Sequence, residues 1–277
     1  MSGEKMALSD KVKEVVDTRI LSQSSINRFL ECRRMFKLTY IENKQGKAEA
    51  GLDYQFDYSW LGKVIHKVLE EFYLPQNFPS EKDLDADGTN KIELVLLSLL
   101  DKHWEFGQPE LKLIDAKTML KLFAQREAQR WKEQRNDPDI NFVPQYREFE
   151  LLDENIRLTA IIDVMWIDKN NNVNPVPRDY KTNKRPEITQ SMKLQALITA
   201  MLINNKLNEM PTHFEFLFLR TNKSLLYEIT TERINKAISI IENMWKEIEN
   251  ENFPKNLKSC YWCPVKNYCE GESRCWI

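Results

Sequence analysis

Glycine is scarce in this chain, with only 7 among 277 residues. A glycine-rich loop of the kind that cradles nucleotide phosphates is therefore not expected. Long apolar runs are also missing, because no stretch reaches the roughly 18 apolar residues that a membrane-spanning helix needs. The N-terminal residues lack the apolar core of a signal peptide, so we expect a cytoplasmic protein with no membrane partner.

Net charge is nearly absent too, with a formal value of −2 at pH 7. The molecule as a whole therefore does not attract nucleic acid by charge, and any such surface must be a local basic patch. The hydrophobic fraction of 42% is sufficient for a substantial core. A length of 277 residues fits one large domain or one domain with an insertion.

Hydrophobic periodicity predicts helices first, then three strands, a helix, two strands and a final helix. We expect an N-terminal arm over residues 1–21 and a single domain over residues 22–277, with a loop at 74–90 and a helical insertion at about 80–135. Helices are predicted over residues 26–38, 60–72, 91–106, 113–134, 190–204 and 233–249, and strands over residues 145–152, 156–167, 173–180, 211–220 and 224–230. The first helix should be capped by Ser24 or Ser25 and contain Cys32. This order indicates an α/β fold with a central mixed sheet flanked by helices.

Residues 158–181 carry the main candidate site, on two apolar strands joined by an asparagine-rich turn. Asp163 lies in the first strand. Asp179 and Lys181 end the second strand, where a spacing of two residues places both side chains on one face. Two carboxylates and a lysine that converge at strand ends suit a divalent metal ion with a cationic helper. The alternative is that both aspartates merely end strands and pair with surface lysines.

The cysteines form a second candidate site near the C-terminus. Cys260, Cys263 and Cys269 follow the spacing C-x2-C-x5-C, and Cys32 lies far upstream. In an intracellular protein, clustered thiols favour a metal over disulfides. Four thiolates hold either a zinc ion or an iron–sulfur cluster. The alternative is reduced cysteines without a metal, and Cys275 is interpreted as a spare.

Four segments stand out in addition to the cysteine tail. They are SSINRFLECRRMF at residues 24–36, GKVIH at 62–66, LTAIID at 158–163 followed by RDYKT at 178–182, and KLQA at 193–196. With the cysteine tail, they make the chain resemble the RecB-like branch of the PD-(D/E)XK nucleases, in particular AddB-type and CRISPR-associated members with a four-cysteine iron–sulfur cluster. The resemblance implies a restriction-endonuclease-like core, with a cluster-binding tail over residues 257–277 joined to Cys32.

The resemblance also implies roles for individual residues. The implied ligands of one or two magnesium or manganese ions are His66, Asp163, Asp179 and the backbone carbonyl of Tyr180. The implied catalytic residues are Asp163, Asp179, Lys181 and Gln195, and the implied ligands of a 4Fe-4S cluster, with zinc as the alternative, are Cys32, Cys260, Cys263 and Cys269. Glu148 or Glu150 would add an outer-shell contact, and strand alternation places both on one face, so this choice stays open. For His66 the alternative is a structural histidine on an apolar helix.

The function implied is that of a metal-dependent deoxyribonuclease, an exonuclease on single-stranded DNA or DNA ends. Its setting would be DNA repair, recombination, replication or CRISPR-type processing, with a helicase or a recombination or CRISPR protein as partner. Local basic clusters supply candidate DNA contacts, with solvated helix faces as the alternative: Arg33, Arg34, Lys37, Lys63, Lys67, Lys184 and Arg185. Two rival functions are a catalytically silent DNA-binding or assembly subunit and a zinc-stapled interaction protein.

Overall fold

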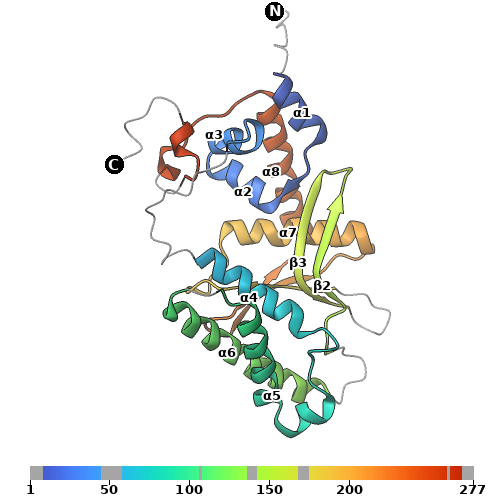
Figure 1. The fold of residues 1–277 in the computed structure, drawn as a ribbon. Coiled ribbons are helices and arrows are strands. Elements are labelled where there is room, and N and C mark those ends of the chain that lie inside the picture. The colour runs from blue at the N-terminus through green and yellow to red at the C-terminus, as the bar shows by residue number, and fades with distance from the viewer. Residues whose placement is uncertain are drawn as a thin grey trace, which may run out of the picture. The chain divides into compact units, whose positions relative to one another are not determined.

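The computed structural model describes residues 9–44, 58–105, 108–135, 142–167, 175–260 and 263–269. Apart from a short strand at Leu21–Ser22 that was not predicted, its helices and strands follow each other in the predicted order (Figure 1). Cys275 lies outside the described residues. Within the described ranges, no helix combines the length and the apolar character that crossing a membrane requires.

The chain divides into two compact units. The first unit contains residues 1–52, 152–160 and 231–277. Its elements are α1 (Asp10–Thr18), β1 (Leu21–Ser22), α2 (Gln23–Glu31), α3 (Arg33–Phe36), a π-helical turn (Lys37–Ile41), α8 (Thr231–Glu249) and two 3-10 turns (Leu257–Ser259 and Lys266–Tyr268). Helix α1, in the expected arm, buries Val12 and Val15 and packs against α8. The single domain over residues 22–277 stays a prediction.

Two expectations about the start of this unit were wrong. Helix α2 is capped by Ser22, whose hydroxyl oxygen accepts a hydrogen bond from the backbone N–H of Ser25 at 3.3 Å, and not by Ser24 or Ser25. Cys32 does not lie inside a continuous helix, because its extended backbone (φ −160°, ψ 110°) separates α2 from α3. The thiol of Cys32 therefore sits at a bend between two helices.

The second unit contains residues 53–151 and 161–230. Its helices are α4 (Tyr58–Phe72), α5 (Glu81–His103), α6 (Glu110–Gln134) and α7 (Gln190–Leu207), and it holds most of β2 (Tyr146–Asp153) and β3 (Leu158–Trp166), with β4 (Val176–Lys181), β5 (His213–Phe218) and β6 (Lys223–Glu228). The strand order is β1-β3-β4-β5-β6, and β2 also pairs with β3. Strand β4 is antiparallel to β3 and parallel to β5. The predicted α/β fold with a central mixed sheet is confirmed.

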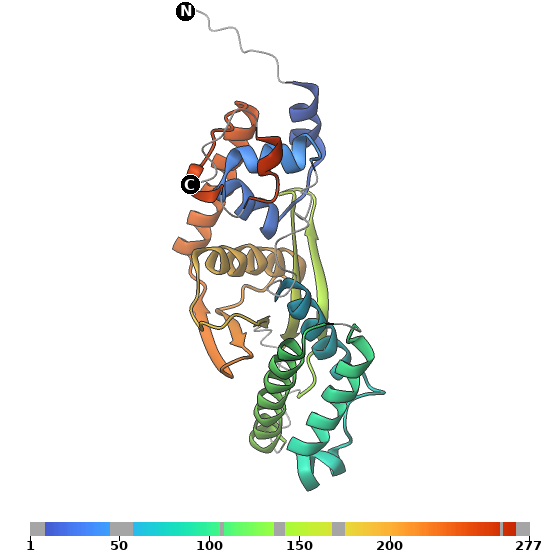
Figure 2. The ribbon, with the colours of Figure 1, turned by 60° about the vertical axis from the view of Figure 1, so that its left-hand side comes forward.

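The loop expected over residues 74–90 is wrong in its second half, because α5 begins at Glu81. The hydroxyl oxygen of Ser80 accepts a hydrogen bond from the backbone N–H of Asp83 at 3.3 Å, and that hydroxyl bonds the Asp83 carboxylate at 2.6 Å. This capping box, together with acidic residues in the first helical turn, offsets the weak helix propensity of the aspartates. Helix α5 then lies beside α6, as both ribbon views show (Figure 2).

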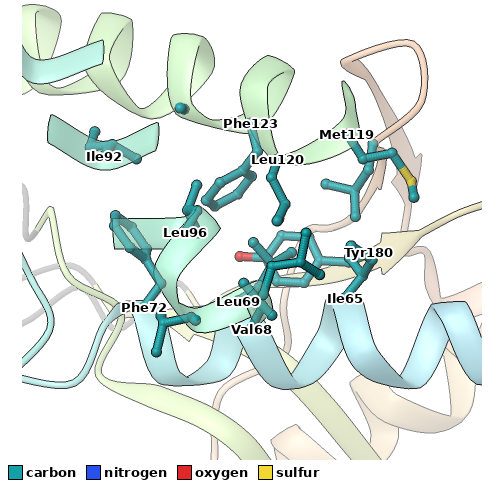
Figure 3. Close-up of a cluster of buried hydrophobic side chains, with 14 of the residues drawn as sticks. Ile65, Val68, Leu69, Phe72, Ile92, Leu96, Met119, Leu120, Phe123 and Tyr180 are labelled. Carbon is teal, nitrogen blue, oxygen red and sulfur yellow. The ribbon is translucent and has the colours of Figure 1, made fainter. Parts of the chain in front are cut away.

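Tyr180 in β4 joins the sheet to the core of the second unit (Figure 3). The apolar stripe of α4 faces α5 and α6 across this core, and its members recur at helical spacing: Ile65, Val68, Leu69 and Phe72. The ring of Phe123 in α6 meets the Tyr180 ring edge-on, with centroids 5.8 Å apart. Strand β4 therefore turns Tyr180 toward α6.

A buried charge network fixes the same face of β4. The Nε–H of Arg178 donates to the Glu215 carboxylate at 2.7 Å, and an Arg178 nitrogen lies 3.7 Å from the Glu127 carboxylate. Glu127 in α6 also accepts a hydrogen bond from the Tyr73 hydroxyl at 2.9 Å. Because side chains alternate along a strand, these contacts leave the opposite face of β4 to the side chains of the candidate site.

This network predicts sensitivity to acid. Burial acts to raise the pKa of Glu127 and of Glu215, but the neighbouring arginines outweigh it and lower both pKa values. Unfolded glutamates, with a pKa of about 4.3, bind protons first, so the free energy of unfolding should fall as pH drops below about 4.3, by up to about 1.4 kcal/mol per pH unit and group. Glu215→Gln should make this pH dependence shallower in urea titrations, and Glu187→Gln, at an exposed site, should not. Equal pH slopes for the two variants would contradict the prediction.

Candidate active site and metal centre

Three polar side chains contact one another at the opposite face of β4, two from the strand itself and one from α7. The ammonium of Lys181 lies 2.7 Å from the Asp179 carboxylate and donates to the side-chain carbonyl of Gln195 at 3.0 Å. The amide N–H of Gln195, in α7, donates to the other Asp179 oxygen at 2.5 Å. Each member thus holds the other two, and α7 positions Lys181 as well as Asp179.

Asp163 connects β3 to both β4 and α4 through hydrogen bonds of its carboxylate. One of its carboxylate oxygens accepts a hydrogen bond from the backbone N–H of Tyr180 at 2.5 Å. The other lies 2.9 Å from Nδ1 of His66. Asp163 is buried, while His66 is about one-third exposed and lies beside the buried stripe of α4. The Tyr180 N–H contact has no sequence signal, because it depends on how β3 and β4 are paired.

Glu148 joins His66 and Asp163 in a group that can hold a metal ion. Ligand atoms of the three side chains lie within 4.8 Å of one another, and in the described ranges no other set of histidine, cysteine and acidic side chains does so. Glu148 has a left-handed backbone with φ 40°, a conformation that costs about 1–3 kcal/mol in a non-glycine residue. Glu150 is exposed and outside this group. The structure therefore places Glu148, and not Glu150, in the candidate site.

The electrostatics of this group favour a bound cation. Burial raises the pKa of Glu148, as does the charge of Asp163, to about 7. Burial acts to lower the pKa of His66, but the charge of Asp163 and its hydrogen bond raise it to about 9. Burial also raises the pKa of Asp179, against the effect of Lys181. A proton on His66 thus compensates crowded carboxylates, and a metal ion bound there would displace it, since a histidine ligand must be neutral.

Glu148 and Glu150 allow a matched test of this geometry. Glu148→Gln should lower metal affinity or metal-dependent activity by about 10- to 100-fold, as loss of a ligand or of its close support does. Glu150→Gln, two residues away at an exposed position, should stay within about twofold of the unchanged protein. Isothermal titration calorimetry with manganese measures the metal affinity of each variant. Equal losses in the two variants would show that Glu148 has no special role.

The four cysteines of the second candidate site line one cavity in the first unit. Met35 and Leu38 line it as well, and Val265 is buried in the same apolar cluster. The structure thus brings together Cys32, Cys260, Cys263 and Cys269 from the two ends of the chain. A thiol-lined, apolar cavity has donors that suit zinc or an iron–sulfur cluster.

The basic candidates are divided between the two units. Arg33 is paired with Glu247 at 2.6 Å and Lys37 with Glu42 at 3.5 Å, and both lie in the first unit with Arg34. The others belong to the second unit and are exposed: Lys63, Lys67, Lys184 and Arg185. Lys63 and Lys67 flank His66 on α4, so these two are the candidates nearest to the metal group in sequence.

Known proteins give an independent comparison. No curated protein matches the chain. A crystal structure of a "Putative exonuclease" from Eubacterium rectale is similar, with 8% sequence identity and a TM-score of 0.49 over 97% of this chain and 95% of the other. The family model of the PD-(D/E)XK nuclease superfamily matches residues 20–270. Because this match spans the carboxylates, the lysine, the histidine and the four cysteines described above, the chain belongs to the PD-(D/E)XK nuclease superfamily.

Proposed function

We propose that this phosphodiester hydrolase is a divalent-metal-dependent deoxyribonuclease, acting as an exonuclease on single-stranded DNA or DNA ends. The observation that carries the proposal is the convergence of two sets of side chains in the second unit. His66, Glu148 and Asp163 have ligand atoms close enough together to hold a cation. Lys181 is held by Asp179 and Gln195 on the strand paired with that of Asp163.

The first role in hydrolysis is to bind the metal ion. Asp163, His66, Glu148 and Asp179 would hold magnesium or manganese, because oxygen and imidazole donors suit both ions. A bound ion of this kind lowers the pKa of water and neutralises charge on the phosphate. Whether the carbonyl of Tyr180 adds a ligand stays a prediction.

Lys181 supplies a fixed positive charge beside the scissile phosphate. Its ion pair with Asp179 and its hydrogen bond to Gln195 set the position of the ammonium before substrate arrives. A preorganised cation stabilises charge that develops in the transition state without reorganising. Gln195 would orient the attacking water or a phosphate oxygen through the same amide group. A preorganised lysine beside two carboxylates favours a catalytic role over that of a catalytically silent subunit.

We also propose a 4Fe-4S cluster on Cys32, Cys260, Cys263 and Cys269. The four sulfurs line one cavity together with the apolar side chains of Met35 and Leu38. Four thiolates in such a setting suit a cluster of several atoms, and a single zinc ion, as in a zinc-stapled interaction protein, is the alternative.

The biological setting rests on the family resemblance alone. We propose a role in DNA repair, recombination, replication or CRISPR-type processing, with a helicase or recombination protein as partner. No contact in the described part of the chain identifies such a partner.

Digestion of end-labelled nucleic acids tests the proposed function. Single-stranded DNA, double-stranded DNA and RNA of one sequence are incubated with magnesium or manganese, with a chelator as control. Metal-dependent release of short labelled products from the DNA strands supports an exonuclease. Internal cleavage of circular DNA, or faster digestion of RNA, would contradict the proposed substrate.

A further inference from the structure

A short segment after α8 connects the two halves of the cysteine site. The carbonyl of Pro254 accepts a hydrogen bond from the backbone N–H of Arg34 at 3.3 Å. Two residues later, the backbone N–H of Asn256 donates to the sulfur of Cys32 at 3.4 Å. The thiol of Cys260 in turn lies 3.8 Å from the carbonyl oxygen of Asn256. One residue thus contacts two of the four cysteines, from opposite ends of the chain.

The side chain of Asn256 fixes this backbone in place. Its amide N–H donates to the carbonyl of Glu31, the residue before Cys32, at 2.7 Å. Its side-chain oxygen accepts from the backbone N–H of Lys258 at 3.3 Å and so caps the 3-10 turn that leads to Cys260. Ser259 adds a second connection between these segments. Its hydroxyl donates to the Glu31 carbonyl at 3.1 Å and accepts from the Asn256 amide at 3.2 Å.

We propose that Asn256 is a positioning residue of the metal centre, which sets both the retention of the metal and the reduction potential through the sulfur of Cys32. This inference rests on the iron–sulfur cluster of the proposed function. An N–H group that points at a ligating sulfur withdraws negative charge from it, and such bonds are a main determinant of cluster potentials. The bond favours the reduced, more negative state of the cluster, so weakening it lowers the potential.

Asparagine suits this place because it does two things that smaller residues do not combine. Its oxygen caps the turn before Cys260, and its N–H groups reach across to the Glu31 carbonyl. A serine at position 256 keeps an oxygen for the cap but has too short a side chain to reproduce the second contact. Asn256→Ser therefore keeps the cap of the turn but loses the hydrogen bond to the Glu31 carbonyl, and Asn256→Ala loses both contacts.

The test uses the full chain, purified without oxygen, as the unchanged protein and as the variants Asn256→Ala and Asn256→Ser. Asn250→Ala, at an exposed position near the end of α8, is the matched control. Iron and sulfide content, loss of iron to a chelator and the midpoint potential are measured for each. We expect Asn256→Ala to lose iron about 10-fold faster than the unchanged protein and to have a lower potential. Asn256→Ser should fall between them, and Asn250→Ala should match the unchanged protein.

The outcomes separate this inference from the cluster itself. Iron and sulfide in the unchanged protein, with equal iron loss and equal potentials in the Asn256 variants, would overturn the role of Asn256 and leave the cluster standing. Zinc in place of iron would refute the cluster, and the rate of zinc release from the same variants would then decide the positioning role. A chain that binds neither metal would refute both proposals.

Discussion

Lys181→Ala is expected to lower the rate of metal-dependent DNA hydrolysis by about 10²- to 10³-fold, the usual effect of removing one preorganised charge from a transition state. The ammonium is held at 2.7 Å from Asp179 and 3.0 Å from the Gln195 carbonyl, so its loss removes a fixed cation that water does not replace. The core below β4 depends on Tyr180 and Arg178, on the other face, and should be unaffected. Initial rates on labelled single-stranded DNA at saturating manganese measure the effect.

The control is Lys236→Ala, which removes a side chain that is 70% exposed in α8 and paired with Glu232. It should leave the rate within about twofold of the unchanged protein. The circular dichroism spectrum of Lys181→Ala should also stay near that of the unchanged protein, and the variant should still bind manganese, because Lys181 is not a proposed ligand. Normal digestion by Lys181→Ala would remove Lys181 from the active site and weaken the proposed site as a whole.

Cys269→Ala is expected to cost the first unit about 3–5 kcal/mol of stability and to lower its melting temperature by about 12–20 °C. The estimate treats the metal centre as a cross-link between chain segments that lie far apart in sequence. A cross-link that closes a loop of about 100 residues stabilises the folded state by nearly 5 kcal/mol. Iron content and absorbance near ~400 nm should fall together with the melting temperature. Differential scanning calorimetry with metal analysis measures the effect.

Cys275→Ala is the natural control, because this fifth cysteine was interpreted as a spare. It should retain the iron content and the melting temperature of the unchanged protein. The reverse pattern, with iron lost from Cys275→Ala and kept in Cys269→Ala, would mean that Cys275 is the fourth ligand.

Much of the fold was predictable because its signals are local and periodic. The apolar stripe of α4 from Ile65 to Phe72 and the alternation along β4 each repeat over several residues, so single exceptions did not hide them. The start of α5 was missed because the capping box of Ser80 and Asp83 lies among acids that read as a loop. The bend at Cys32 was missed because nothing in the neighbouring residues breaks a helix.

The candidate site was predictable to the extent that one strand or one known motif specifies it. Asp179 and Lys181 share a face through simple alternation, and Gln195 meets both from α7. The alternation of side chains along a strand does not predict which of Glu148 and Glu150 joins the site. The left-handed backbone of Glu148 departs from regular strand geometry. Asn256 was missed entirely, since its contacts join segments more than 200 residues apart.

The division of the chain has a consequence for protein synthesis. The first unit is assembled from both ends of the chain, and the second unit lies between them. A ribosome therefore releases all residues of the nuclease site before it has made Cys260, Cys263 and Cys269. Since domains tend to fold as units during translation, the nuclease site can form early, while Cys32 stays without its three partner cysteines until Cys269 has been made. The proposed metal centre would therefore be loaded after the nuclease site has folded, and a chain truncated before Cys260 would lack that centre.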